Sequence, residues 1–498
     1  MDVRLGAVND ELRMTNDEYV DRCFHSSFVV RHSSFLSRRI LLGICLVLAF
    51  AAQQVAGKEK VDLLVHGGTV VAMDSAKRLL GDGAIAVRGE HIVEVGPSAQ
   101  VSEKYEAARL ISAQGKIVLP GLINTHNHAP MVLFRGIADD LRLMEWLQKY
   151  IFPAEARNVT REFVEWGTLL ACLEMIRSGT TTYADMYYFE DQIAEATARA
   201  GMRGVLGETI LQFAAPDNKT PEDTLAYTEK FIQRWKDHPL IIPAVAPHAP
   251  YTNSADTLKA CKALADKYGV PVIIHVSETR DEVKQIQEKY GTTSTQWLER
   301  LGVLGPNVLF NHAVWVTEDD MAVIKKRGVT VSHNPESNMK LASGTAPIVR
   351  MLALGIPVGL GTDGAASNNN LDMFEAMDFA AKLHKLVSMD PTVLPAQQVL
   401  EMATIGGARA LRMDREIGSL EPGKKADFIL VDSQRAHALP LYNVYSQLVY
   451  DLKGADVRTS VINGKIVMLD GRVLTLDDAS IKQKTREFQT RILQSLKN

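Results

Sequence analysis

Two histidines, His126 and His128, are separated by a single residue, a spacing that is suited to binding one metal ion. The apolar residues 116–119 precede them and have the character of a strand, followed by Pro-Gly and a second apolar pair. Because side chains alternate along a strand, both imidazoles point to the same side and can offer two nitrogen ligands to one metal ion. Taken alone, the pair fits equally well with two polar residues at a strand end.

Other polar, titratable residues stand where later apolar runs stop. They are Asp185, Glu208, His248, His275 with Glu278, His312, His333 with Asn334, and Asp363. In a βα barrel the carboxyl ends of the strands meet at one mouth, where catalytic residues collect. Scattered histidines would not follow strand ends in this way, so the whole set indicates a site more strongly than any one member.

Four of these residues, His126, His128, His275 and Asp363, form a nitrogen-rich set completed by a carboxylate. Such a set suits one zinc or ferrous ion and leaves a coordination position for water. A Thr-Asp-Gly turn such as residues 362–364 needs no metal, so the assignment of Asp363 depends on the other strand ends.

Glu278 follows His275 by three residues, so it can share the barrel mouth without binding the metal. A carboxyl group beside an activated water is suited to carrying protons. The alternative is a glutamate that caps a helix expected over residues 278–289. His312 has two interpretations as well: an imidazole that orients or polarises the attacking water, or a hydrogen-bonded core histidine.

Eight strand-like runs alternate with amphipathic helical stretches through the middle of the chain. The runs are residues 117–124, 180–186, 203–210, 241–246, 270–275, 308–312, 328–332 and 356–362. This alternation requires parallel strands joined by helical crossovers, and eight of them predict a closed (β/α)8 TIM-type barrel of the α/β class. Residues 162–176 show the apolar stripe of one crossover helix.

Short strands and tight turns mark both flanks of this region. Residues 58–119 contain brief apolar runs separated by glycines, and the same texture returns in residues 420–476. Neither flank has enough strands for a stable sheet. We therefore predict a small composite β-sandwich from both flanks, a barrel over residues 120–419 and a C-terminal helix over residues 477–498.

The first 57 residues have the layout of an export signal. Ser37, Arg38 and Arg39 precede an apolar run, residues 40–52, that is short for a membrane span. The arrangement resembles a twin-arginine signal, the route for proteins exported already folded around a cofactor. We expect an exported, periplasmic protein, with membrane anchoring by an uncleaved leader as the alternative.

Composition limits the partners. A net charge of −4 over 498 residues gives no indication of a nucleic-acid partner. Beyond the leader the cysteines are Cys172 and Cys261, whose apolar helical surroundings predict buried free thiols. A membrane would be a partner only through an uncleaved leader, and homo-oligomerisation stays open.

Four motifs, in this order, resemble the amidohydrolase superfamily, and most of all the methylthioadenosine/S-adenosylhomocysteine deaminases and their chlorohydrolase relatives. The motifs are residues 120–128 (PGLINTHNH), 275–279 (HVSET), 333–344 (HNPESNMKLASG) and 361–370 (GTDGAASNNN). The resemblance extends from about residue 61 to beyond residue 467, and only the leader falls outside it.

The resemblance implies a mononuclear metal-dependent hydrolase, with zinc as the expected ion and iron as the alternative. It implies His126, His128, His275 and Asp363 as the metal ligands. Asp363 is also implied as the base that takes the proton of the attacking water.

Further roles follow from the same resemblance. Glu278 is implied as a substrate contact and proton carrier, and His312 as a hydrogen-bond partner near the attacked carbon. Glu155 is implied on the ribose hydroxyls and His248 against the substrate. Without the resemblance, Glu155 would be taken for an exposed helix carboxylate, whereas His248 lies in a proline-flanked loop suited to presenting a ring.

These roles predict a hydrolytic deaminase of an adenine-type nucleoside, with methylthioadenosine, adenosine and S-adenosylhomocysteine as candidate small-molecule substrates. The products would be the inosine-type compound and ammonia. Deamination of guanine, an oxopurine or cytosine, or dechlorination of a triazine, is the alternative on this scaffold. Glu278 favours deamination because an amine leaving group needs a proton. A non-catalytic exported binding protein is a more remote alternative.

The third strand-end region departs from the family pattern. Relatives that accept S-adenosylhomocysteine are expected to hold its carboxylate with arginines there, but no arginine occurs between Arg203 and Arg234. Residues 211–216 (LQFAAP) are largely apolar instead. Since burying an unpaired carboxylate is costly, we expect this stretch to face a smaller or less charged 5′ substituent.

Overall fold

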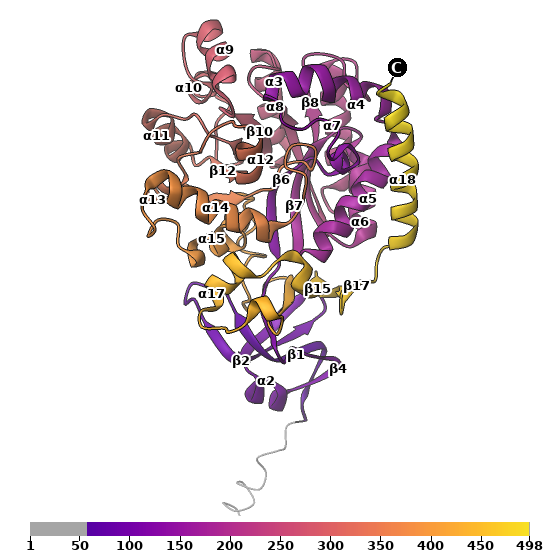
Figure 1. The fold of residues 1–498 in the computed structure, drawn as a ribbon, viewed down its shortest axis with the longest axis vertical. Coiled ribbons are helices and arrows are strands. Elements are labelled where there is room, and N and C mark those ends of the chain that lie inside the picture. The colour runs from indigo at the N-terminus through magenta and orange to yellow at the C-terminus, as the bar shows by residue number, and fades with distance from the viewer. Residues whose placement is uncertain (1–56, 498) are drawn as a thin grey trace, which may run out of the picture. The chain divides into compact units, whose positions relative to one another are not determined.

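The computed structural model describes residues 57–497, and the predicted export signal lies outside the described residues. Eight parallel strands follow one another in chain order, each paired with the next, and helices surround them (Figure 1). They are β6 (Leu122–Asn127), β7 (Thr180–Tyr187), β8 (Arg203–Ile210), β9 (Ile241–Pro247), β10 (Val272–Val276), β11 (Val308–His312), β12 (Thr330–His333) and β13 (Val358–Leu360).

The first and last of these strands close the barrel at the end where the predicted site lies. The Asp363 N–H donates to the His126 carbonyl at 3.0 Å, and the Thr125 hydroxyl donates to the Leu360 carbonyl at 2.9 Å. Gly361 permits this approach, because a Cβ there would come within 2.9 Å of the His126 backbone nitrogen. The predicted (β/α)8 barrel is therefore confirmed.

Every residue of β7 and β8 is buried, as expected for parallel strands that are covered on both faces. Their inner side chains, among them Ala184, Met186 and Val205, pack with Ile273 and Leu309 inside the barrel. The outer faces pack against the helices. The helices of the barrel region are α5 (Arg161–Arg177), α6 (Glu190–Ala200), α7 (Pro221–Trp235), α8 (Ala255–Tyr268), α9 (Arg280–Tyr290), α10 (Ser294–Arg300), α11 (Glu318–Arg327), α12 (Pro335–Lys340), α13 (Ile348–Ala353), α14 (Met373–Ser388), α15 (Ala396–Met402) and α16 (Ile405–Ala410). Of these, α16 packs Ile405 and Ala408 into the inner cluster of the barrel.

Several of these helices begin at a side chain that caps them. Thr160, Ser254 and Thr317 each accept a hydrogen bond from the backbone N–H three residues later, which satisfies a donor that the helix leaves free. The crossover helix expected over residues 162–176 is α5, one residue longer at each end.

A long connection between β6 and α5 passes over the barrel mouth and lines the cavity described below. Its second half contains π-helical turns, a feature that is frequent at functional sites. Its elements are η1 (Ala129–Phe134), α3 (Leu143–Glu145), η2 (Trp146–Ile151) and α4 (Phe152–Asn158).

The two flanks of the barrel form one nine-stranded sheet, which confirms the composite domain. Side chains from both flanks share one core; Val65 and Ile85 of the first flank pack with Phe428 and Val461 of the second. The strands are β1 (Glu59–Val71), β2 (Leu79–Arg88), β3 (His91–Pro97), β4 (Tyr105–Ser112), β5 (Lys116–Pro120), β14 (Phe428–Asp432), β15 (Val457–Ile462), β16 (Lys465–Leu469) and β17 (Arg472–Val473). Short helical elements accompany them: α2 (Ser98–Lys104), η3 (Ala436–Ala438), α17 (Val444–Ser446), η4 (Gln447–Asp451) and η5 (Gly454–Asp456).

The first predicted barrel strand, residues 117–124, needs a correction because it is two strands. β5 pairs with β1 and β14 in the composite sheet, and β6 begins the barrel. The break falls at Gly121, where a Cβ would lie 2.1 Å from the Thr181 hydroxyl. The apolar run is continuous because both strands are buried.

Helix α18 (Asp478–Ser495) closes the described chain and packs along α5 and α4 (Figure 1). Arg157 and Asn158, at the end of α4, donate to the carbonyl and the hydroxyl of Ser495. No helix within residues 57–497 is long and apolar enough to span a membrane. Cys172 and Cys261 are free and fully buried, as predicted.

Candidate functional site

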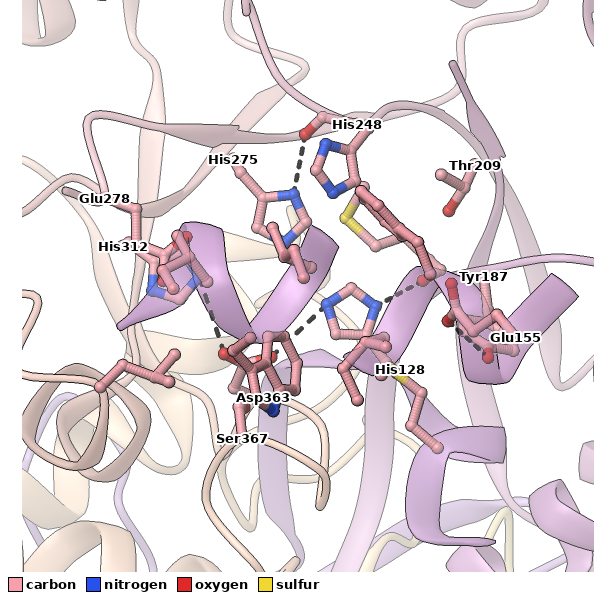
Figure 2. A pocket seen from close by; sticks show the side chains of 18 of the residues that line it. His128, Glu155, Tyr187, Thr209, His248, His275, Glu278, His312, Asp363 and Ser367 are labelled. Atoms are coloured by element: carbon pink, nitrogen blue, oxygen red, sulfur yellow. Dashed lines mark hydrogen bonds and ion pairs between the residues drawn. The ribbon is translucent and has the colours of Figure 1, made fainter. Parts of the chain in front are cut away.

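One cavity at the carboxyl ends of the barrel strands collects most of the predicted site residues (Figure 2). Among the described residues to which the sequence analysis gave a metal, catalytic or substrate role, His126 alone does not line it. His126 is fully buried and its ring lies 4.8 Å from that of His128. The residues that line the cavity are His128, Glu155, His248, His275, Glu278, His312 and Asp363.

Four donor atoms meet beneath this cavity. The Nε2 atom of His126 lies 3.2 Å from Nε2 of His275 and 3.5 Å from Oδ1 of Asp363. The Nε2 atom of His128 lies 3.4 Å from the same carboxylate oxygen. Donor atoms bound tetrahedrally at zinc-like bond lengths are roughly 3.3 Å apart. The arrangement therefore fits one small divalent cation.

Backbone carbonyls fix two of the imidazoles. Nδ1 of His128 donates to the Met186 carbonyl at 2.6 Å, and Nδ1 of His275 donates to the His248 carbonyl at 2.7 Å. Each bond leaves the Nε2 lone pair directed at the other donors, a common arrangement for metal-binding histidines. Burial lowers the pKa of His126, His128 and His275, which keeps these rings neutral at pH 7.

Helix α12 orients two other groups of the site. The Ser337 hydroxyl donates to Oδ2 of Asp363 at 2.6 Å. Nδ1 of His312 donates to the Asn338 side-chain oxygen at 2.9 Å, while Nε2 of His312 lies 3.8 Å from Oδ2 of Asp363. Burial alone would lower the pKa of His312, but the carboxylates of Glu278 and Asp363 raise it above its usual value.

Glu278 points into the cavity from the loop after β10 (Figure 2). Burial raises the pKa of its carboxyl group to about 7. The alternative interpretation of Glu278 as a helix cap is wrong, because α9 begins at Arg280 and Thr279 caps it.

Glu155 reaches the same cavity from α4 and is buried, not exposed. The Tyr187 hydroxyl donates to its carboxylate at 2.7 Å. Burial raises the pKa of Glu155 to about 7, although the hydrogen bonds of Tyr187 and Tyr188 act in the opposite direction. Across the cavity, burial lowers the pKa of His248 to about 3, so its ring is neutral.

The outer wall of the cavity is apolar. None of the residues that line it in the described chain is arginine or lysine. The expectation for residues 211–216 needs a correction, because none of them lines the cavity; Phe213 instead packs against Phe152 of the wall, with ring centres 5.7 Å apart. The apolar wall consists of Met131, Leu143, Trp146, Leu147, Ile151 and Phe152.

Four strand-end residues that seemed to belong to the site do not line the cavity: Asp185, Glu208, His333 and Asn334. Asp185 and Glu208 alternate with the inward residues Met186 and Thr209, so they face the surrounding helices, where they are fully buried. His333 is buried beside the site, with its Nε2 atom 3.1 Å from that of His384.

Sequence reasoning missed several supporting residues. Tyr187, Thr209 and Ser367 line the cavity, and Ser337 and Asn338 orient the groups described above. The last three lie within the motifs at residues 333–344 and 361–370, so the motifs pointed to the segments. Nothing in those motifs indicated which side chain meets which partner.

Comparisons with known proteins agree with this geometry. Residues 117–467 match the family model described as Amidohydrolase family. A 5-methylthioadenosine/S-adenosylhomocysteine deaminase of Syntrophus aciditrophicus is 49% identical over 88% of this chain and 99% of its own length. A 5′-deoxyadenosine deaminase of Methanosarcina mazei is 46% identical over 86% of this chain and 97% of its own length.

A solved structure has the same fold. A zinc-bound adenosine deaminase from Xanthomonas campestris superposes with a TM-score of 0.86 at 39% identity, covering 88% of this chain and all of that one. The family match over more than half of the chain, together with these relatives, shows that the chain belongs to the amidohydrolase family.

Proposed function

We propose that this protein is a hydrolytic deaminase of adenine-type nucleosides that uses one zinc ion and releases ammonia and the inosine-type product. The observation that carries the proposal is that donor atoms of His126, His128, His275 and Asp363 meet next to the cavity into which Glu278 points. The names of the relatives support it, since they are deaminases of adenosine or of its 5′-modified forms.

We assign the zinc ion to His126, His128, His275 and Asp363. A zinc ion held by three neutral nitrogens and one carboxylate would take a water as its fifth ligand, because zinc in catalytic sites can expand to five-coordination. With zinc bound, the site gains a water that is activated for attack at neutral pH, which is the chemistry the ion supplies. Iron with the same ligands is the alternative.

The chain's own groups carry the protons. Asp363 accepts the proton of the attacking water, with Ser337 holding its second oxygen in place. Glu278, whose pKa is about 7, is protonated in a large fraction of molecules at neutral pH and can protonate the ring nitrogen of the substrate. The proton that Asp363 has taken from the water then reaches the amine, which leaves as ammonia, and the hydroxyl proton of the adduct restores Glu278. His312, fixed by Asn338, donates a hydrogen bond near the attacked carbon.

The remaining lining residues determine which nucleoside fits. Glu155 accepts hydrogen bonds from the ribose hydroxyls, and His248 lies against the substrate. The apolar wall favours an uncharged 5′ substituent, as does the lack of arginine and lysine among the cavity residues of the described chain. Methylthioadenosine, 5′-deoxyadenosine or adenosine should therefore react faster than S-adenosylhomocysteine.

An ammonia-release assay with the zinc-loaded protein tests the proposal. The panel contains adenosine, methylthioadenosine, 5′-deoxyadenosine, S-adenosylhomocysteine, adenine, guanine and cytosine, with chloride release from a chlorotriazine measured in parallel. We expect the highest kcat/KM for a nucleoside with an uncharged 5′ group. Release of chloride alone, or of ammonia from guanine or cytosine alone, would refute the proposal.

The metal assignment has its own test. His126→Ala should remove both the bound zinc and the activity, because it deletes the donor that the other ligands surround. His91→Ala changes a half-exposed histidine of the composite sheet and should keep both. A fully active His126→Ala protein without metal would contradict the assignment.

A further inference from the structure

The start of α9 shows an unusual use of a capping carboxylate. Thr279 caps the helix, and its hydroxyl accepts from the Glu282 N–H at 3.3 Å. In a capping box, the carboxylate at the position of Glu282 accepts from the backbone of the capping residue itself. Here Oε1 of Glu282 accepts from the Ser277 N–H at 2.7 Å and Oε2 accepts from the Glu278 N–H at 2.8 Å. The carboxylate thus holds the two residues that precede the cap.

Glu282 is built firmly into this position. Its side chain is buried, with 3% of the residue exposed, and the Ser294 hydroxyl donates to its Oε1 atom at 2.8 Å. Glu282 does not line the cavity. Any influence on the reaction must therefore pass through the backbone of Ser277 and Glu278.

The backbone that Glu282 holds is in an unfavourable conformation. Ser277 has a φ of +53°, in the left-handed region that a residue with a Cβ rarely occupies. The Ser277 carbonyl accepts from the Trp315 N–H at 2.9 Å, and the Val276 carbonyl accepts from the Ala313 N–H at 3.0 Å. Hydrogen bonds on both sides therefore fix the turn from which Glu278 enters the cavity (Figure 2).

We propose that Glu282 is a positioning residue for the deamination: by accepting both backbone N–H groups, it holds Glu278 where it can deliver protons to the substrate. This inference rests on the proposed function, because it takes Glu278 as the proton carrier. A side chain that served only to cap α9 would have no need to bind the amide of Glu278.

Glu282→Gln is the informative substitution. It keeps the size of the side chain but replaces one acceptor oxygen with an NH2 group, which then faces a backbone N–H and cannot bond to it. We expect kcat for methylthioadenosine to fall about tenfold or more, since small misplacements of reacting groups are costly, while KM and zinc content stay near wild type.

Asp320→Asn is the matched control. Asp320 occupies the same position in α11, is fully buried, and accepts from the Thr317 N–H at 2.9 Å in an ordinary capping box. It should lower the midpoint of thermal unfolding without changing kcat. Ser294→Ala removes only the third bond to Glu282 and should lower kcat in the same direction by a smaller factor, which decides the question if Glu282→Gln does not fold.

The outcomes separate the two proposals. If Glu282→Gln and Ser294→Ala lose thermal stability as Asp320→Asn does but keep the wild-type kcat, Glu282 is only a helix cap and the inference is overturned. If the zinc-loaded wild-type protein releases no ammonia from any nucleoside, the proposed function itself fails, whatever the variants do.

Discussion

Two carboxylic acids, Glu155 and Glu278, face one cavity from different elements, and burial raises the pKa of each to about 7. Their neighbours differ. Tyr187 donates to Glu155, which favours its ionised form. Glu278 has neighbours of both signs: His312 favours its ionised form, whereas the negative charges of Asp363 and Glu282 favour its protonated form. Glu155 is thus suited to accept hydrogen bonds from hydroxyls, and Glu278 is suited to donate a proton.

Glu155→Gln should reduce kcat/KM for adenosine and methylthioadenosine roughly ten- to a hundredfold, because charge-assisted hydrogen bonds to the ribose are lost. Adenine, which has no ribose, should be affected far less. Steady-state kinetics on the three substrates measures both effects. Glu145→Gln changes a half-exposed residue of the same connection that does not line the cavity; it serves as the control and should change neither. An equal loss on adenine would show that Glu155 does not bind the ribose.

The pH dependence should report the same group. Glu155 is protonated below its pKa of about 7 and accepts hydrogen bonds less well in that form. The ratio of kcat/KM for methylthioadenosine to that for adenine should therefore rise as the pH increases through about 7 and level off above it. The ratio cancels the titration of Glu278, which acts on both substrates. In Glu155→Gln the ratio should be flat, and a persistent rise would assign the titration to another residue.

At the scale of residues, the sequence predicts which residues lie at strand ends better than it predicts which way their side chains face. Histidines at strand ends could be found because the catalytic residues of a barrel collect at that end, where His126, His128 and His275 lie close enough together to hold a metal ion. Asp185 and Glu208 also follow apolar runs, but alternation along their strands turns them outward. Predicting this requires the register of each strand, which depends on tertiary packing.

At the scale of elements, the boundary between β5 and β6 explains what an apolar pattern can and cannot show. Both strands are buried, so hydrophobicity runs through Gly121 without interruption. The sequence predicts β8 and β11 with the bounds that are observed, because a turn or loop precedes and follows each of these strands. When two buried strands follow each other directly but belong to different sheets, the sequence shows one continuous apolar run. Only the proline and glycine within that run mark the junction.

A buried ion pair joins the barrel to the composite sheet. The Arg203 guanidinium, at the start of β8, donates to both carboxylate oxygens of Asp427 at 3.2 and 3.3 Å. Their side chains are 2% and 3% exposed. Arg203 also donates to the Pro239 carbonyl and to the side chain of Asn463, so its hydrogen bonds reach several segments.

Asp427→Ala should lower the free energy of unfolding by about 3–5 kcal/mol, because it leaves a buried guanidinium without its carboxylate. Arg203→Met combined with Asp427→Leu should be less destabilising than the sum of the two single changes. Urea denaturation followed by tryptophan fluorescence measures both. The kcat should stay near wild type, since Arg203 lies at the opposite end of β8 from the cavity residue Thr209. A cost of Asp427→Ala below about 1 kcal/mol would show that the pair contributes little.

At the scale of the whole molecule, the candidate metal site exists only in the folded chain. Its donors come from β6 and the residue that follows it, from β10 and from the segment after β13, so the site forms once the first and last strands of the barrel have met. Metal binding and folding are therefore coupled, and the ion must be available in the compartment where the chain folds. An export route that carries folded proteins would allow the metal to be inserted before export.

The first 57 residues allow a test of whether the metal is inserted before export. If Ser37, Arg38 and Arg39 begin a twin-arginine signal, Arg38→Lys with Arg39→Lys should block export and leave active, metal-loaded enzyme in the cytosol, because recognition requires the arginine pair while folding does not. Deaminase activity in periplasmic and cytosolic fractions measures the outcome. Arg22→Lys with Arg31→Lys makes the same chemical change outside the pair and should leave export unaltered. Normal export of the first variant would exclude the twin-arginine route and favour a general secretory signal or an anchor, in which case the barrel would fold and take up its metal after crossing the membrane.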